Sequence, residues 1–177
     1  MNILITVAHP DDETIGMGGT IKKLSKNNEI TLCVMTDGAS AQYDGKKMIK
    51  VRQDACKKAG KILGISKFHF LNFPDMKLDS ISHVEMNKEL EKIIKKFNPK
   101  ILYSTSYNDL NKDHQKVFES CSVISRPISS KIKQFLCFEM GGRNKTPFNP
   151  NTYVDISKEL SFKLKALNQY KTEINPF

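Results

Sequence analysis

The sequence contains no tryptophan, and its basic residues do not alternate with aromatic ones. Proteins that bind single-stranded nucleic acid stack bases on aromatic side chains beside a basic groove, so nucleic acid is not an expected partner. No apolar run approaches the roughly 20 residues that a membrane-spanning helix requires. The first eight residues lack the basic segment and the small-residue cleavage site of a signal peptide. We therefore expect a cytoplasmic protein without a membrane span.

Two further signatures are missing. The four cysteines are far apart in the sequence and include no C-x-x-C pair, which excludes a disulfide framework and a thiolate zinc site and favours buried, reduced thiols. There is no G-x-S-x-G turn, so a serine hydrolase is not expected. Gly16, Gly18 and Gly19 do not complete a dinucleotide-binding G-x-G-x-x-G motif, because position 21 is isoleucine. These glycines are better explained by close packing of a helix on a sheet.

The chain has 177 residues, 39% of them hydrophobic, which fits one globular domain over residues 1–177. Its net charge of +9 comes mostly from lysine. The simpler interpretation of this charge is a solvated, lysine-rich surface. The alternative is attraction to an acidic substrate, such as a nucleotide-linked or phosphorylated molecule.

Strand-like and helix-like segments alternate along the chain. Apolar runs predict strands, and apolar residues spaced three and four apart predict helices. The expected strands are Ile3–Ala8, Ile30–Met35, Lys67–Asn72, Ile101–Ser104 and Phe135–Phe138. The expected helices are Glu13–Lys26, Lys46–Leu63, Ser82–Phe97 and Asp113–Ile124. Tyr153–Lys171 predicts a short strand followed by a last helix carrying Leu160, Leu164 and Leu167.

This alternation predicts an α/β fold of Rossmann-like type. The sheet should be doubly wound and mostly parallel, with five strands or slightly more and with helices on both faces. Right-handed crossovers give the strand order 3-2-1-4-5, which makes the first and fourth strands neighbours. The chain winds away from these two strands in opposite directions, so a crevice should open between the loops that follow them.

Both of these loops carry side chains that can bind a metal. His9, Asp11, Asp12 and Glu13 follow the first strand, and residues 105–114, which end in His114, follow the fourth. Taken separately, the acidic residues could cap a helix and compensate its dipole, and a lone histidine is more often a surface residue. Their expected meeting at one crevice favours a shared site.

Two imidazoles and one carboxylate form a ligand set suited to zinc. We assign His9, Asp12 and His114 as metal ligands. Three protein ligands leave a fourth position for water, which is the arrangement of catalytic rather than structural zinc sites. Asp11 remains free to act on that water. His69 and His83 lie in other segments and are expected to have no role in the site.

The segment His9-Pro10-Asp11-Asp12-Glu13, with Gly16, Gly18 and Gly19 after it, resembles the first motif of the PIG-L/LmbE-like zinc-dependent N-deacetylases. Asp109-Leu110-Asn111-Lys112-Asp113-His114 is similar to the second motif of that family. Weaker matches follow in the expected order over nearly the whole chain. They are Thr36-Asp37-Gly38, Arg52, Leu63-Gly64, Phe73-Pro74-Asp75, Phe148 to Asn151, Tyr153-Val154-Asp155 and the segment Lys165–Lys171.

The resemblance implies removal of an acetyl group from an N-acetylated amino sugar or sugar conjugate, including nucleotide-linked ones. It implies Zn²⁺ as cofactor, with Fe²⁺ or another divalent metal as an alternative. His9, Asp12 and His114 match the metal ligands, and Asp11 matches the general base. Arg52 and Asp75 match positions that hold the sugar or its attached group, although the sequence alone would place both at the surface.

The chain departs from the family pattern at three places. Asn111 stands where many members have a histidine that assists proton transfer or oxyanion stabilisation; an amide can donate a hydrogen bond but cannot shuttle a proton. Asp11 would then serve as both base and acid, with Asn111 as a catalytic hydrogen-bond donor. Ala55 replaces an acidic residue, and Asp54 lies one position early. Gly141-Gly142-Arg143 replaces a Ser/Thr-containing turn, which suggests an unusual pocket or one completed by another subunit of a homo-oligomer.

One further residue and two rival functions remain open. Asp113 is a candidate for orienting a metal ligand or Asn111, with a helix N-cap as the equally good alternative. The rivals to deacetylation are a metallohydrolase that acts on another amide or ester, and a non-catalytic homologue that binds metal or sugar.

Overall fold

The computed structural model of the protein describes residues 1–43, 46–128 and 130–174. Five strands form one sheet in the order β3-β2-β1-β4-β5, and every neighbouring pair is parallel. The strands are β1 (Asn2–Val7), β2 (Glu29–Thr36), β3 (Lys67–Phe73), β4 (Ile101–Thr105) and β5 (Gln134–Phe138). The helices are α1 (Asp12–Leu24), α2 (Lys46–Leu63), α3 (His83–Phe97), α4 (Lys112–Ile124), α5 (Leu160–Leu167) and α6 (Lys171–Ile174), with a 3-10 turn, η1 (Leu78–Ser80). The predicted α/β fold and strand order are confirmed.

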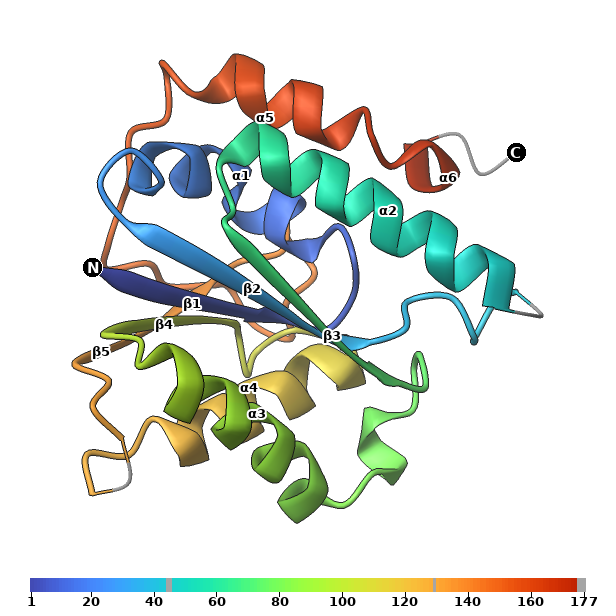
Figure 1. The fold of residues 1–177 in the computed structure, drawn as a ribbon, viewed down its shortest axis with the longest axis vertical. Helices are drawn as coiled ribbons and strands as arrows, with labels where there is room; N and C mark the ends of the chain where they lie inside the picture. The colour runs from blue at the N-terminus through green and yellow to red at the C-terminus, as the bar shows by residue number, and fades with distance from the viewer. Residues whose placement is uncertain (44–45, 129, 175–177) are drawn as a thin grey trace.

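Helices cover both faces of the sheet. α1, α2 and α5 lie over one face, and α3 and α4 lie over the other (Figure 1). The central strand β1 contributes to both layers, because Ile3 and Ile5 join the core under the first group of helices and Leu4 joins the core under the second. A strand buried on both faces explains why β1 is an uninterrupted apolar run rather than an alternating one.

The ends of two helices follow the signals expected from the sequence. Gly64 follows the last residue of α2 with a φ of 91°, and Asn98 caps α3 in the left-handed conformation with a φ of 49°. Glycine and asparagine tolerate this conformation better than other residues, so they end helices readily. These stops fix the lengths of the connections into β3 and β4.

The predicted short strand at the start of Tyr153–Lys171 is wrong. Residues 153–156 belong to no strand, and Tyr153 is 80% exposed. Ile156 instead packs against Gly19 of α1, where any Cβ would collide with the isoleucine side chain. The segment thus fastens onto a helix rather than extending the sheet. The close approach of Gly16 to the Phe138 ring of β5 supports the packing role expected for these glycines.

The last long helix buries different residues from those that indicated it. Leu160 and Leu164 of α5 are exposed, whereas Ala166 and the following Tyr170 are buried against the core under α1 and α2. Leucine spacing predicted the helix but not its buried face. Among the described residues, no helix combines the length and apolarity needed to cross a membrane.

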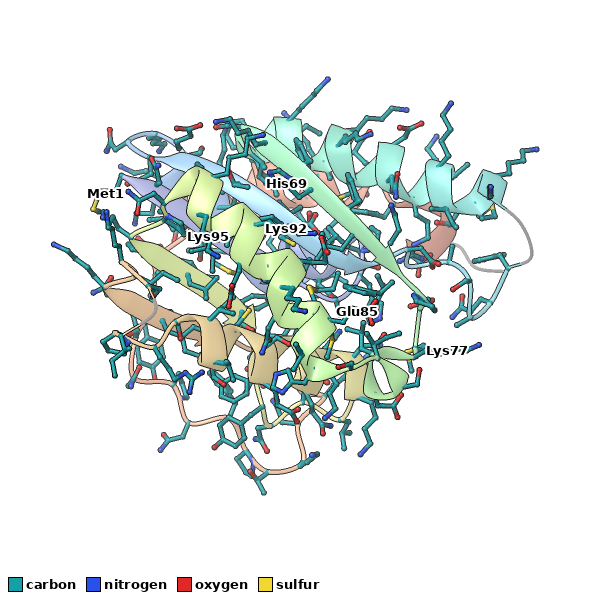
Figure 2. All side chains as sticks on the ribbon, turned by 60° about the horizontal axis from the view of Figure 1, so that its bottom comes forward. Met1, His69, Lys77, Glu85, Lys92 and Lys95 are labelled. Carbon is teal, nitrogen blue, oxygen red and sulfur yellow. The ribbon has the colours of Figure 1, made fainter. Side chains whose placement is uncertain are left out.

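Much of the positive charge lies on surfaces that face solvent. The outward face of α3 carries Glu85, Lys92 and Lys95, all of them exposed (Figure 2). Lys92 and Lys95 pair with Glu89 and Glu91 of the same helix. Such exposed pairs contribute little to stability, about 0.3–0.5 kcal/mol each. They match the simpler interpretation of the lysine content, a solvated surface.

Candidate metal centre

The two loops that follow β1 and β4 meet at the carboxyl end of the sheet. α1 begins directly after Asp11 and lies on one face, whereas α4 begins directly after Asn111 and lies on the other (Figure 1). The strands β1 and β4 pair with each other, which brings His9 and His114 together although 105 positions separate them. The expected crevice at the switch point is present.

Three side-chain atoms converge there. His9 Nδ1 lies 3.3 Å from His114 Nε2 and 3.5 Å from Asp12 Oδ2, and His114 Nε2 lies 3.3 Å from Asp12 Oδ2. Tetrahedral coordination at zinc–ligand distances near 2.0–2.1 Å places neighbouring ligand atoms about 3.3 Å apart. His9, Asp12 and His114 therefore stand at the spacing of three corners of a zinc tetrahedron, and this donor set fits the ion that the sequence suggests.

The second nitrogen of each imidazole contacts a buried carboxylate. His114 Nδ1 lies 2.8 Å from Asp109 Oδ2, and His9 Nε2 lies 3.2 Å from Asp113 Oδ2. Carboxylates in this position fix the tautomer and the ring orientation of a metal-binding histidine and raise its basicity. From the sequence, Asp113 is a candidate for orienting a ligand, and the contact with His9 fits that role. Asp109 was not singled out, although it opens the segment that resembles the second family motif.

Asp113 is positioned by the backbone of another loop. Its carboxylate accepts hydrogen bonds from the amides of Met76, at 2.8 Å, and Leu78, at 3.0 Å. The alternative interpretation of Asp113 as the N-cap of α4 is wrong, because Asn111 holds that position and its Oδ1 accepts from the Asp113 amide at 2.8 Å.

A second group of ligand-capable atoms uses the other side of the same imidazole. This second group consists of His9 Nε2 and carboxylate oxygens of Asp75 and Asp113. His9 Nε2 lies 3.2 Å from Asp75 Oδ1. Both oxygens of Asp113 are already engaged by backbone amides. This group is therefore the weaker candidate for a metal, and its acidic members serve better as hydrogen-bond partners of His9.

The electrostatics of the cluster favour a bound cation. Burial alone lowers the pKa of His114, but the charge of Asp12 and the hydrogen bond with Asp109 outweigh it and raise the pKa to about 9. Burial likewise lowers the pKa of His9, and contacts with Asp113 and Asp12 raise it well above its ordinary value. The pKa of Asp12 is lowered, because the charge of His114 outweighs the opposite effect of burial. The same field of carboxylates would attract a divalent ion.

Asp11 lies beside this cluster in an unusual backbone conformation. Its φ is 126°, a region that side chains other than glycine rarely adopt. Its amide donates to Glu13 Oε2 at 3.1 Å, and Glu13 Oε1 accepts from the Tyr170 hydroxyl at 2.5 Å. The Asp11 side chain makes no capping hydrogen bond to α1, so the cap interpretation does not explain it. Burial, followed by the charge of Asp12, raises the pKa of Asp11 well above its ordinary value.

Arg52 and Asp75 are buried, not surface residues as the sequence alone suggested. Arg52 extends from α2, donates to the Pro10 carbonyl at 3.0 Å and lies 3.5 Å from Asp11 Oδ2. Burial opposes its charge, but the pKa of Arg52 is raised by Asp11 and by Glu173, with which it forms an ion pair. The Asp75 amide donates to the Ser40 hydroxyl at 3.0 Å.

The three donor residues line one cavity of about 410 Å³ together with Asp11, Arg52 and Asp75, whereas Asp109 and Asp113 lie behind the imidazoles and are not part of its lining. Its lining includes the side chains predicted for the site, namely His9, Asp11, Asp12, Arg52, Asp75, Asn111 and His114. Asn111 Nδ2 donates to the Met76 sulfur at 3.6 Å, and Oδ1 of the same side chain caps α4. Gly141 and Arg143 also border the cavity, as does Glu173 of α6, which the sequence analysis did not single out. Gly38 holds a turn at its edge with a φ of 63°.

A doubly wound α/β fold with a His–Asp–His donor set at its switch point defines a candidate metal-dependent protein. Residues 4–124 match the model of the PIG-L family, described as GlcNAc-PI de-N-acetylase, and the chain belongs to this family.

Two curated relatives and a solved structure are similar to almost the whole chain. A diacetylchitobiose deacetylase from Thermococcus kodakarensis is 28% identical over 97% of this chain and 69% of its own length. YaiS, an uncharacterized deacetylase of Escherichia coli, is 32% identical over 96% of this chain and 90% of its own length. The structure of N,N'-diacetylchitobiose deacetylase from Pyrococcus horikoshii is similar with a TM-score of 0.79 and 27% identity, covering 97% of this chain and 70% of that one.

Proposed function

We propose that this protein is a metal-dependent hydrolase that removes the acetyl group from an N-acetylated amino sugar or sugar conjugate. The observation that carries the proposal is the three-atom donor set of His9, Asp12 and His114 beside the partly exposed carboxylate of Asp11, in one cavity of a PIG-L family chain. Zinc suits these ligands best, with Fe²⁺ as the alternative. When bound, the metal supplies a Lewis acid that activates water and polarises the acetyl carbonyl.

Asp11 is the residue proposed to move the proton. Its raised pKa, caused by burial and by the charge of Asp12, makes it a stronger base than an exposed aspartate. It accepts a proton from the attacking water at a carboxylate oxygen and returns it to the nitrogen of the leaving amine. The water oxygen bonds to the acetyl carbon, the C–N bond breaks, and acetate and the free amine are released.

The remaining groups bind and orient. Asn111 lines the cavity, and its side-chain amide, which would exchange the Met76 sulfur for substrate, is proposed to stabilise the negative charge that develops on the acetyl oxygen. It cannot exchange a proton at neutral pH, which leaves Asp11 as both base and acid. Asp109 and Asp113 orient the two imidazoles, and Asp75 offers a carboxylate to sugar hydroxyls. The free cysteines are compatible with the cytoplasmic location proposed for the chain.

The proposal is tested by incubating the zinc-loaded protein with free, chitobiose-type and nucleotide-linked N-acetyl sugars. Mass spectrometry should detect the mass change in which hydrogen replaces an acetyl group, together with released acetate. Asp11→Asn should retain its metal by elemental analysis and lose most of the turnover. Full turnover in the metal-loaded variant would remove Asp11 from the mechanism.

Two results would replace the proposal by its rivals. Phosphate or another acid released in place of acetate would indicate a different metallohydrolase. A zinc-containing protein that binds acetylated sugars without turning any of them over would indicate a binding protein that has kept its metal site.

A further inference from the structure

The cavity contains an ion pair that joins two distant parts of the chain. Glu173, in the short helix α6, pairs with Nη1 of Arg52 in α2, and α6 lies beside α2 in Figure 1. The other terminal nitrogen of Arg52 is occupied by the Pro10 carbonyl and the Asp11 carboxylate. The guanidinium side chain is only 6% exposed. Arg52 therefore has partners for both terminal nitrogens before any ligand enters.

Carboxylates outnumber guanidinium groups in the described lining of the cavity. Asp11, Asp12, Asp75 and Glu173 stand against Arg52 and Arg143, and the two imidazoles and a bound divalent ion would offset this excess. Arg143 is exposed to solvent, which screens its charge. No lysine belongs to the lining among the described residues, although lysine supplies most of the net charge of +9. The basic surface thus does not extend into the site.

These contacts decide what kind of conjugate the cavity can hold. Of the two guanidinium groups in the lining, Arg143 is exposed and Arg52 is buried, so Arg52 is the one that would hold a phosphate or carboxylate deep in the cavity if its N–H groups were free as a planar fork. Glu173 and the Pro10 carbonyl occupy the two terminal nitrogens of that fork, so an anion would have to displace an ion pair to reach it. A neutral sugar does not need to displace Glu173.

We propose that the site takes electrically neutral N-acetyl sugars and that Glu173 is the residue that excludes anionic conjugates by occupying Arg52. The inference rests on the proposed deacetylase function for its kinetic readout, but not for its binding readout. It also assigns a role to the C-terminal helix, which brings a specificity-determining carboxylate into a cavity formed mainly by the loops of the sheet.

The experiment compares a neutral and an anionic substrate. N,N'-diacetylchitobiose and N-acetylglucosamine 1-phosphate are given to the zinc-loaded protein, and kcat/KM is measured for each. We expect the wild-type protein to favour the neutral sugar by at least about ten-fold, and Glu173→Gln to reduce this ratio by about ten-fold or more. The matched control is Glu91→Gln, which removes the same charge from the exposed face of α3 and should leave the ratio within about two-fold.

Binding by calorimetry to the same zinc-loaded proteins separates this inference from the proposed function. If neither sugar is turned over but the neutral one binds more tightly and Glu173→Gln removes the difference, the deacetylase proposal fails and the specificity proposal stands. A wild-type preference for the phosphorylated sugar, an unchanged ratio in Glu173→Gln, or binding of neither sugar would overturn the specificity proposal. Circular dichroism and the melting temperature establish that Glu173→Gln is folded, and Glu173→Ala provides a second variant with the same expected direction.

Discussion

Replacing Asp109 by asparagine tests whether the carboxylates behind the imidazoles support metal binding. Asp109 Oδ2 lies 2.8 Å from His114 Nδ1, and Asp109 Oδ1 accepts from the backbone N–H of Asn111 at 2.8 Å. Asparagine has the same shape, and its Oδ1 can still accept from the Asn111 backbone amide, so the loop should keep its conformation. The substitution removes the negative charge that makes His114 a more basic ligand, and it puts an NH2 group, which cannot accept, opposite His114 Nδ1.

The magnitude follows from burial and geometry. Loss of such a supporting carboxylate typically costs 10–100-fold in metal affinity or activity. The side chains of His114 and Asp109 are only 6% and 2% exposed, and their separation is that of a charge-assisted hydrogen bond. We therefore expect the upper part of the range, a loss of about 30–100-fold in zinc affinity, or roughly 2–2.7 kcal/mol. Competition with a chromophoric zinc chelator at constant pH measures it without any substrate.

Two further variants set the scale of that experiment. His114→Ala deletes a ligand and should weaken zinc binding more than Asp109→Asn does, whereas Glu91→Gln on α3 should leave it unchanged. If a folded Asp109→Asn protein binds zinc within two-fold of the wild type, the pairing of Asp109 with His114 does not support the metal site. Melting temperatures measured without metal would expose any general loss of stability.

Three other predictions concern the supports of the site and the thiols. Tyr170→Phe removes the hydroxyl that donates to Glu13 at 2.5 Å. Urea denaturation should show that the free energy of unfolding falls by about 1.5–3 kcal/mol, and a fall below about 0.5 kcal/mol would contradict the contact. Gly38→Ala places a Cβ against the Pro10 ring, at a residue whose φ of 63° favours glycine. The free energy of unfolding should therefore fall by more than about 1–2 kcal/mol, and an unchanged melting temperature would count against this turn. Burial raises the pKa of Cys137 to about 11. At pH 8, iodoacetamide should therefore label Cys137 more than about a hundred-fold more slowly than free cysteine, and rapid labelling seen by mass spectrometry would refute the burial of this thiol.

The sequence predicted the parts of the fold that depend on local patterns. Apolar runs and helical spacing located five strands and the longer helices, and handedness then gave the strand order. That order was sufficient to expect His9 and His114 at one crevice, because the first and fourth strands of such a sheet are neighbours. The strand expected at Tyr153 failed because a strand needs a partner, and pairing is not encoded in the segment itself.

The burial of Arg52 could have been predicted, whereas its ion pair could not. Arg52 precedes Ala55, Cys56 and Ala59 on α2 by three, four and seven residues, which places it on the apolar stripe of that helix. A charged residue on a buried stripe requires a partner, which points to a site. The partner, Glu173, is 121 positions away in a four-residue helix, and no local pattern connects the two.

The conformation of Asp11 links the buried core to the proposed chemistry. A non-glycine residue at a φ of 126° costs on the order of 1–3 kcal/mol and persists only where its surroundings enforce it. Two sets of hydrogen bonds do so here. The Asp11 carbonyl accepts from the amides of Thr14 and Ile15, both at 2.9 Å, while its amide is held by Glu13. Glu13 is in turn fixed by Tyr170, which is 2% exposed and follows α5. The backbone conformation at Asp11 points its carboxylate away from that of the neighbouring Asp12. As a result, Asp12 belongs to the donor set, whereas Asp11 lies beside Arg52.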